Sequence, residues 1–513
     1  MKTNGFVRGA MILIFFNLIG KVIGAIYRIP LANLLGAVGI GEYQLVFPLY
    51  SLMLAISVSG IPVAISRIVS EYNSKGLYGD TRKLIRIAFL YLTIISLVCV
   101  AIVVIGAKII ANIQGNSDIY LCYYGIAPAI LFVALLSVFR GYFQGCLNML
   151  PTALSGFVEQ IGRLVFGLWF ASRFVRFGSV YGVFGAVLGI SISEAVACLF
   201  LGIYYIFYSK RKNNQSVSMY SVGYISNQLI KTALPITLGG IASPITSIID
   251  SLLVVNILMF IGFGSDYATS LLGLQSGIVD PLINIPIVIA VSISSSILPN
   301  LTNVYVKKDK KELKELIEKA FQITLSVSLA CAIGYIIFGK QILEFLYAKT
   351  LSFEELIIST KLLFVGVINL IFLSLVYIST SVLQGMGKQK LSAKSILIGS
   401  AIKIVLTLAL VSVKNFNILG AMLSGGISYV FVFLYNYKQI TKECELDMTR
   451  LLFKLSIQEC AVCLFAFFAN LVFGVFFSER ISMLVGGVIS VLIFMLSYYF
   501  LFFPKKRKRF LLD

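Results

Sequence analysis

Long apolar runs separated by short polar segments make up most of this chain. A helix of about 20 apolar residues crosses the hydrocarbon core of a bilayer, and windows of that kind occur about fourteen times. The pattern predicts an all-α integral membrane protein with about fourteen transmembrane helices. The predicted spans lie near residues 9–35, 45–70, 87–110, 119–143, 154–175, 182–208, 232–258, 271–300, 320–345, 356–383, 394–413, 419–437, 455–477 and 482–503.

The basic residues are divided unequally between the two sides of these spans. With the N-terminus placed inside, the cytoplasmic segments contain 27 lysines and arginines, and the outward segments contain five. Because positive residues favour the cytoplasmic side, we predict a multi-pass plasma membrane protein with both termini in the cytoplasm. The first span contains Lys21 and lacks a clear cleavage site, which predicts an uncleaved helix. The terminal PKKRKR then anchors the chain to anionic lipid.

Composition excludes several other classes of protein. The chain is 59% hydrophobic and 12% charged, about half the charged fraction of a soluble domain. The net charge of +20 therefore reflects membrane topology, and no nucleic-acid partner is predicted. The absence of histidine excludes histidine metal ligands and Ser-His-Asp catalysis. Cys460 and Cys463 form a CxxC in an apolar span without a second pair, so we expect no metal and no cofactor.

The second half of the chain repeats the first. Gln144-Gly145 after the fourth span recurs as Gln384-Gly385 after the tenth, an offset of 240 residues. Each half holds six spans, and an even number predicts a parallel repeat related by an axis along the membrane normal. This is a transporter architecture. We predict an N-lobe at 1–208, a cytoplasmic linker at 209–231, a C-lobe at 232–437, and two further spans with a basic tail at 455–513.

Cations lie inside the first two predicted spans. Lys21 and Arg28 share one helix face with Gly24, because each residue of an α-helix turns about 100°. An ionisable residue that faces lipid costs about 3 kcal/mol or more, so we predict that both cations line a cavity. Arg67 in the second span is either a third cavity cation or the partner of Glu71, one turn further on.

Other polar positions suit a central cavity. Asp250 in span 7 and Asp280 in span 8 lie on faces with hydroxyl or amide side chains, and both are candidates for binding a coupling ion. A capped or paired structural aspartate is the alternative for Asp250. Glu159 and Arg163, at i and i+4, are a candidate structural pair. Prolines inside spans 2, 7 and 8 predict kinked or broken backbone: Pro62, Pro235, Pro244, Pro281 and Pro286.

The start of the chain resembles a known family. The run GKVIGAIYRIPLANLLGAVGIGEYQLVFPLYSL and the later SGIPVAISRIVSEYNSKG are similar to stage V sporulation protein B and its relatives. That family belongs to the polysaccharide-exporter branch of the MOP flippase superfamily, which includes the lipid II flippase MurJ. The resemblance extends through both QG loops and the LPNLTN at 298–303. It implies a MATE-like fold of two six-helix lobes, and transfer of an undecaprenyl-pyrophosphate-linked saccharide from the inner to the outer leaflet.

The resemblance also implies roles for individual residues. In the family a basic residue precedes a V-x-G turn in helix 1, which here is Lys21, and a second helix-1 arginine matches Arg28 after a shift of one residue. A functional arginine near helix 2 corresponds loosely to Arg67. The family's span-8 arginine after an aspartate is missing, since Asp280 is followed by proline. Lys403 is the candidate substitute for that cation.

The sequence therefore predicts a flippase for an anionic lipid-linked saccharide, not an enzyme. A pyrophosphate requires clustered cations, and Na⁺, a proton or the membrane potential would drive transport. Membrane lipids and cell-wall or spore-cortex synthesis proteins are the predicted partners. One alternative is a cation-coupled multidrug antiporter, which would favour carboxylates in the first lobe. Another is an exporter of a different lipid-linked oligosaccharide. A glycosyltransferase would need large outward loops, and a scaffold would not need buried cations.

Overall fold

The computed structural model describes residues 2–211 and 218–444, and every regular element in them is a helix. The prediction of an all-α protein is confirmed. Nine stretches of these residues are long and apolar enough to cross a membrane. The spans predicted at 455–477 and 482–503, the basic tail and the CxxC lie outside the described residues. The chain divides into two compact units, Met1–Gly273 and Leu274–Asp513. This boundary lies inside the eighth predicted span, and the lobes drawn from the repeat stay a prediction.

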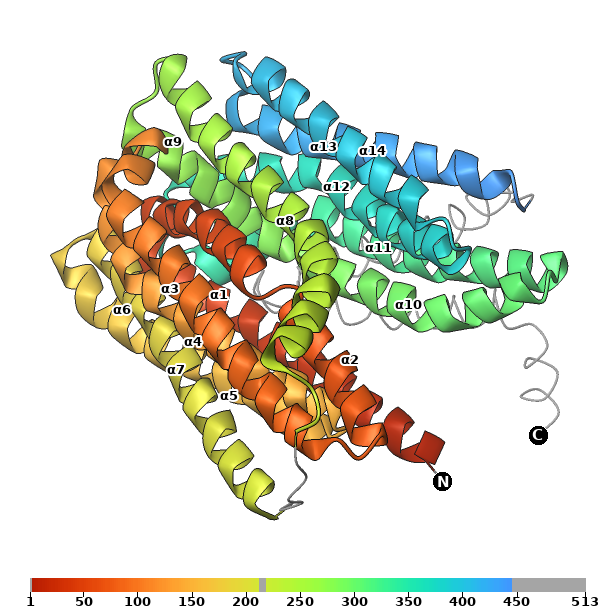
Figure 1. The fold of residues 1–513 in the computed structure, drawn as a ribbon. Coiled ribbons are helices and arrows are strands. Elements are labelled where there is room, and N and C mark those ends of the chain that lie inside the picture. Colours follow the sequence, from red (N-terminus) through yellow and green to blue (C-terminus); the bar gives the residue numbers. More distant parts are fainter. Residues whose placement is uncertain (1, 212–217, 445–513) are drawn as a thin grey trace, which may run out of the picture. The chain divides into compact units, whose positions relative to one another are not determined.

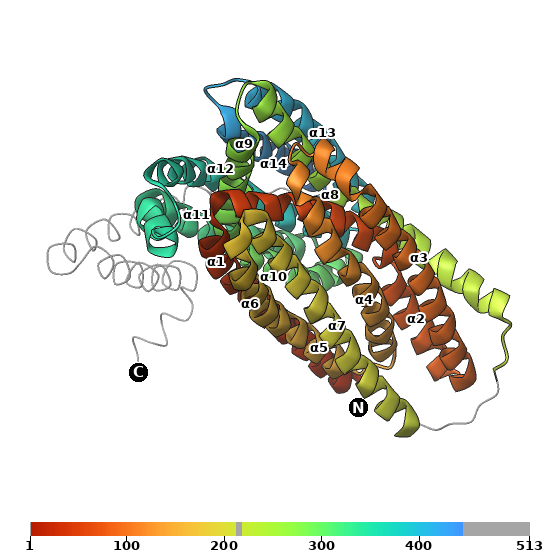
Figure 2. The same cartoon turned by 90° about the vertical axis from the view of Figure 1, so that its left-hand side faces the viewer.

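Unit 1 is a bundle of long helices (Figures 1 and 2). In it α4 packs against α2, α3 and α7, and α8 packs against α1, α2 and α3. Its elements are α1 (Lys2–Ser57), α2 (Ile61–Ser74), α3 (Tyr78–Ile113), η1 (Ser117–Ile119), α4 (Tyr120–Gly145), α5 (Met149–Gly162), η2 (Arg163–Gly167), α6 (Leu168–Phe174), η3 (Val175–Phe177), α7 (Ser179–Arg211), α8 (Val222–Phe260) and α9 (Ser265–Leu272).

The first two predicted spans are joined differently from the sequence expectation. The residues between them, GAVGIGEYQ at 36–44, predict a glycine-rich turn, but the helix continues and only Gly36 leaves it, with φ 71° and ψ −179°. A residue with a Cβ rarely adopts that backbone conformation, so this glycine allows the kink. The second predicted span is interrupted at residues 58–60, and Pro62 lies in the first turn of α2, where its missing N–H costs nothing.

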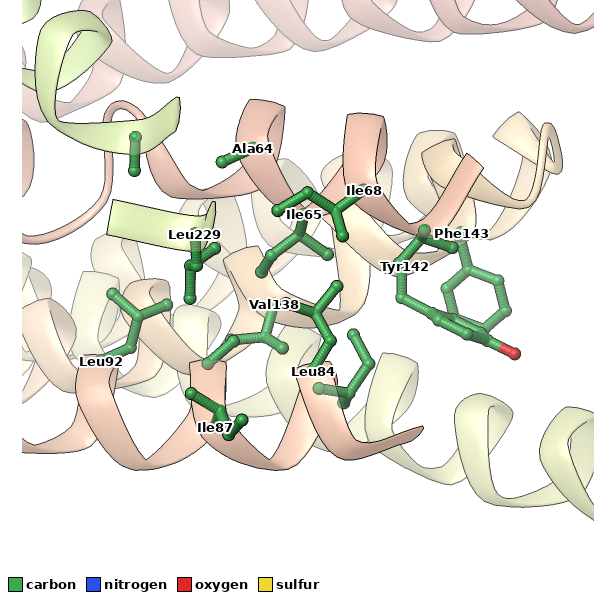
Figure 3. Close-up of a cluster of buried hydrophobic side chains, with 14 of the residues drawn as sticks. Ala64, Ile65, Ile68, Leu84, Ile87, Leu92, Val138, Tyr142, Phe143 and Leu229 are labelled. Carbon is green, nitrogen blue, oxygen red and sulfur yellow. The ribbon is translucent and has the colours of Figure 1, made fainter. Parts of the chain in front are cut away.

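The core of unit 1 lies where α2, α3, α4 and α8 meet. Figure 3 shows Ile65 and Ile68 of α2 facing Leu84 of α3 and Val138 of α4. Leu229 of α8 lies in the same cluster and is 1% exposed. Protein interiors are packed as densely as organic crystals, so this cluster fixes the four helices relative to one another. It includes residues from the first turns of α8.

Unit 2 contains η4 (Gly273–Val279, whose first residue belongs to unit 1), α10 (Asp280–Val306), α11 (Lys310–Tyr347), α12 (Phe353–Gly385), α13 (Gln389–Val411) and α14 (Asn417–Thr441). Its core joins α10, α11, α12 and α14, with Leu301, Phe321, Leu383 and Phe433 among the buried side chains. With these helices, each of the twelve spans predicted up to residue 437 falls mainly on described helices, the second being broken at residues 58–60.

The internal repeat is visible in the turns that follow α4 and α12. Both helices end at the glycine of the QG pair, and a left-handed residue follows two positions later, Leu147 (φ 59°) and Gly387 (φ 74°). Asn148 N–H donates to the Phe143 carbonyl at 2.9 Å, and Lys388 N–H donates to the Leu383 carbonyl at 2.8 Å. These 6→1 bonds define the same helix-ending motif, at the offset of 240 residues found in the sequence.

An ion pair in unit 2 joins the turn after α12 to the residues that follow α14. The Lys388 ammonium donates to a Glu443 carboxylate oxygen at 2.6 Å. This hydrogen bond holds the pKa of Glu443 below its ordinary value of 4.5. A depressed carboxyl pKa contributes stability above the ordinary pKa and loses it as the pH falls through the folded pKa.

We therefore expect the Glu443→Gln variant to be less stable than wild type at neutral pH. The difference is expected to be below about 1 kcal/mol, because both partners are partly exposed, and to shrink at acidic pH, as the pH falls through the lowered folded pKa. Thermal midpoints of both proteins at the two pH values measure it. Glu315→Gln, at an exposed position on α11, is the control, and an equal difference at both pH values would contradict the assignment.

Candidate functional site

Four ionisable side chains from three membrane helices and one π turn meet inside unit 1. Arg140 of α4 donates to Glu159 of α5 at 2.9 Å, and Arg163 at the start of η2 donates to the other oxygen of Glu159 at 3.2 Å. Arg163 also donates to Glu194 of α7 at 3.3 Å. We call these four residues the charged quartet. The sequence-predicted pair of Glu159 and Arg163 is thus half of a larger network.

The local backbone brings the quartet together. Ser155, Glu159 and Arg163 follow one another at i, i+4 and i+8 and so share a face of the helix. The Ser155 hydroxyl accepts from Arg140 Nε at 3.0 Å, which fixes that guanidinium. At Arg163 the helix changes to a π turn of five residues, a feature that often occurs at functional sites. Gly189 lets α7 approach this turn closely, since a Cβ there would lie 2.5 Å from a backbone atom of Gly167.

The carboxylates lie deeper than the arginines. The Glu194 side chain is 3% exposed and that of Glu159 13%, whereas the two arginine side chains are 22% and 24% exposed. Among the described residues, Arg163 Nε and Glu194 Oε2 are buried and have no hydrogen-bond partner. A buried ion pair is tolerated only when most of its polar atoms are satisfied. The quartet thus joins three helices and keeps unsatisfied hydrogen-bonding capacity inside the membrane region.

The polar face of α1 lies against this part of the bundle. Cβ positions at Gly20 and Gly24 would each lie 3.4 Å from the Gln160 side chain, next to Glu159. Arg28, one turn further on, lies within electrostatic reach of Tyr27 and Tyr43, and so does Arg163. The structure therefore places Arg28 in the same neighbourhood as the quartet.

Two other cations of unit 1 are predicted for the site, Lys21 and Arg67. Lys21 lies on the same helix as Arg28, but its side chain lies outside the described part. Arg67 is exposed on α2. Its proposed partner Glu71 pairs instead with Lys75 at 2.6 Å, so the alternative of an Arg67–Glu71 pair is not what the structure shows.

The remaining predicted residues are distributed over both units. Asp250 is half-buried on α8 in unit 1, whereas Asp280 begins α10 in unit 2, directly after the π turn η4. Lys403 is half-buried on α13. One turn earlier on α13, the Gly399 carbonyl accepts from Ser428 of α14 at 2.7 Å, so this stretch of α13 packs against α14. Ion coupling by the aspartates and substrate contact by Lys403 stay predictions.

Sequence reasoning missed Arg140 and Glu194. Both lie inside apolar runs, in LLSVFRGYF and GISISEAVA, so the criterion that singled out Lys21 would have found them too. Their partners could not be found in this way, because Arg140 lies 19 positions from Glu159 and Glu194 lies 31 positions from Arg163, on different helices.

Comparison with known proteins agrees with this architecture. A family profile described as "Polysaccharide biosynthesis protein" matches residues 6–305. Lipid II flippase MurJ of Bacillus subtilis (strain 168) is 27% identical over 86% of this chain and 83% of its own. Stage V sporulation protein B of the same organism is 24% identical over 90% of this chain and 89% of its own. The resemblance read from the sequence is confirmed.

Solved structures show the same fold. A structure of lipid II flippase MurJ in an inward closed conformation superposes with a TM-score of 0.74 at 14% identity, covering 96% of this chain and 99% of that one. An inward-facing multidrug resistance MATE family transporter of the MOP superfamily gives 0.66 at 14% identity, covering 85% and 98%. The predicted MATE-like MOP fold is confirmed. These similar proteins are flippases and transporters, not enzymes.

Proposed function

This chain belongs to the polysaccharide biosynthesis protein family, and from that premise we propose that it is a flippase for a lipid-linked precursor. The cargo we propose is an undecaprenyl-pyrophosphate-linked saccharide of the lipid II type, moved from the inner to the outer leaflet for cell-wall or spore-cortex synthesis. The similarity to lipid II flippase MurJ over most of both chains supports this proposal.

The observation that carries the proposal is the set of arginines inside the membrane bundle. Arg140 and Arg163 are paired with the two carboxylates of the quartet, and Arg28 acts electrostatically on the same two tyrosines as Arg163. These three arginines and two glutamates have an excess of one positive charge. Placing guanidinium groups at membrane depth is costly, and their planar donor groups match phosphate oxygens. A pyrophosphate is the part of such a lipid that has to be stabilised while it leaves water.

A multidrug antiporter is less consistent with this site. A carrier of organic cations needs carboxylates that are free to bind them. Here both carboxylates of the quartet, Glu159 and Glu194, accept from arginines at 2.9–3.3 Å. The similarity to the MATE family transporter concerns the fold, and the paired charges favour an anionic cargo.

The orientation that we propose follows the basic residues. The segments with 27 of the lysines and arginines face the cytoplasm, and both termini lie there. In this orientation the turns after α4 and α12 are cytoplasmic. The loop between α3 and α4, which contains Asp118, faces outward.

Complementation tests the proposal. In cells depleted of their lipid II flippase, wild type is expected to restore lipid II in the outer leaflet, and well-inserted Lys21→Ala and Arg28→Ala are expected not to. Arg176→Ala, an exposed arginine in η3, is the matched control and should rescue. Arg67→Ala tests whether an exposed cation on a membrane helix contributes to lipid II transport. Rescue by every variant would rule out the proposed cationic site. Failure of well-inserted wild type to rescue would rule out lipid II as the cargo.

A further inference from the structure

The chain segment that leads into α8 is fastened to the turn between α2 and α3. Asp80, in the first turn of α3, is 0% exposed. Its carboxylate accepts three hydrogen bonds from one short segment: from the Ser218 hydroxyl at 2.7 Å, from Met219 N–H at 3.0 Å and from Tyr220 N–H at 2.9 Å. Hydrogen bonds to a charged group are roughly twice as strong as neutral ones.

A second set of contacts holds the same segment. The Lys83 ammonium donates to the Tyr220 carbonyl at 2.7 Å, and its positive charge lies near the Asp80 carboxylate. The Tyr220 ring stacks on Tyr72 of α2, with ring centroids 5.7 Å apart. The Tyr72 hydroxyl donates to Gln228 of α8 at 2.7 Å. We call Tyr72, Asp80, Lys83 and their contacts with 218–228 the linker clamp.

Beyond the clamp, α8 lies directly on the break that precedes α2. Gly60 N–H donates to the Thr237 hydroxyl at 3.1 Å. A Cβ at Gly60 would lie 2.1 Å from the Ala233 carbonyl oxygen, so the two backbones touch. Ala233 is 6% exposed and Leu229, drawn in Figure 3, is 1% exposed. The first half of α8 is therefore held by polar, aromatic and apolar contacts together.

The internal repeat relates this contact between α8 and α2 to transport. By sequence α8 is the first helix of the second repeat, the counterpart of α1, yet one face of its first half, with Ile225, Leu229 and Ala233, is buried in the core of unit 1. In a transporter built from two repeats, the halves separate alternately on the two faces of the membrane. When the two halves separate on the membrane face where Asp80 lies, the first half of α8 has to move away from α2.

We propose that the linker clamp is a latch for this face, with Asp80 as the residue that positions the start of α8. Intact, it keeps the contact between Gly60 and Ala233 closed, on the face that the basic residues assign to the cytoplasm. Its release lets α8 separate from α2 there. The inference rests on the proposed transport function for its purpose, and on the described contacts for its mechanism.

Thiol accessibility tests the latch without any substrate. The reporter is Ala233→Cys in a chain whose eight native cysteines are replaced, labelled with a membrane-impermeant maleimide from the cytoplasmic face. Asp80→Asn places an amide N–H₂ against backbone donors. It is expected to raise the labelling rate by about tenfold, the factor that corresponds to about 1.4 kcal/mol. Asp118→Asn, an exposed carboxylate beyond the other end of α3, is the matched control and should leave the rate unchanged.

A second reporter separates a latch from a general loss of structure. Thr269 of α9 is 0% exposed and lies beyond the far end of α8. Asp80→Asn is expected not to raise labelling of Thr269→Cys from the outer face. If Asp80→Asn does not insert, Lys83→Met removes the bond to Tyr220 and should raise Ala233→Cys labelling by a smaller factor.

Unchanged labelling of Ala233→Cys in an inserted clamp variant would overturn the latch, and so would a parallel rise at both reporters. Since labelling needs no cargo, the labelling results can support the latch even when lipid II complementation fails. Loss of the latch leaves the complementation result standing, so the failures of the two proposals are distinguishable.

Discussion

Arg163→Ala is expected to destabilise the protein by about 3–5 kcal/mol, the cost of leaving a buried charge without its partner. The residue left behind is Glu194, whose side chain is 3% exposed and accepts from Arg163 at 3.3 Å. Glu159 also loses one of its two arginines. For a unit of this size the change corresponds to a fall of roughly 10 °C in the thermal midpoint, measured on the purified protein in detergent.

Two further variants separate lost charge pairing from lost packing. Arg163→Gln combined with Glu194→Gln removes both charges and keeps two amide side chains, so it should recover more than half of the loss. Arg173→Ala removes an exposed arginine of α6 and should change stability by no more than about 0.5 kcal/mol. A midpoint for Arg163→Ala equal to that of Arg173→Ala would show that the quartet does not hold the bundle together.

Gly41→Ala is expected to separate α1 from α9. A Cβ at Gly41 would lie 2.0 Å from the Thr269 carbonyl oxygen and 2.8 Å from its carbon. Both are backbone atoms, so relief requires the helix to move. Overpacking of this kind costs about 1–3 kcal/mol or more. Faster hydrogen exchange in residues 265–272, together with a lower thermal midpoint, is the expected result.

The matched control is the same substitution where space is open. Gly156 lies inside α5, and a Cβ there would meet nothing within 4 Å. Gly156→Ala should therefore stabilise the helix by about 0.5–1 kcal/mol, because alanine loses less backbone entropy on folding. Equal effects of the two substitutions would mean that helix propensity, not the α1–α9 contact, decides the result at Gly41.

Part of the candidate site could be read from the sequence. Glu159 and Arg163 were predicted as a pair because i,i+4 spacing places both on one helix face, and their oxygen–nitrogen distance is 3.2 Å. The stripe with Gly24 and Arg28 on α1 was predicted from the same periodicity, and it lies beside Gln160. Spacing within one helix is enough for such statements. It says nothing about which helix lies opposite.

Tertiary packing decided the rest of the site. Arg140 and Glu194 enter the quartet because α4 and α7 pack beside α5. Glu71 had two bases within one turn, and the structure pairs it with Lys75 rather than Arg67. The clamp on Asp80 joins residues more than 130 positions apart, and no local pattern marks it.

By itself, then, the sequence determined the membrane class, the positions of the described spans and the internal repeat. These follow from local quantities, namely the length of an apolar run and the recurrence of a turn motif, and the bilayer acts on each span separately. Only the tertiary structure decided which charges neutralise one another and which segment holds α8. Those outcomes depend on the rotation and the distance of neighbouring helices, which result from side-chain packing across the whole unit.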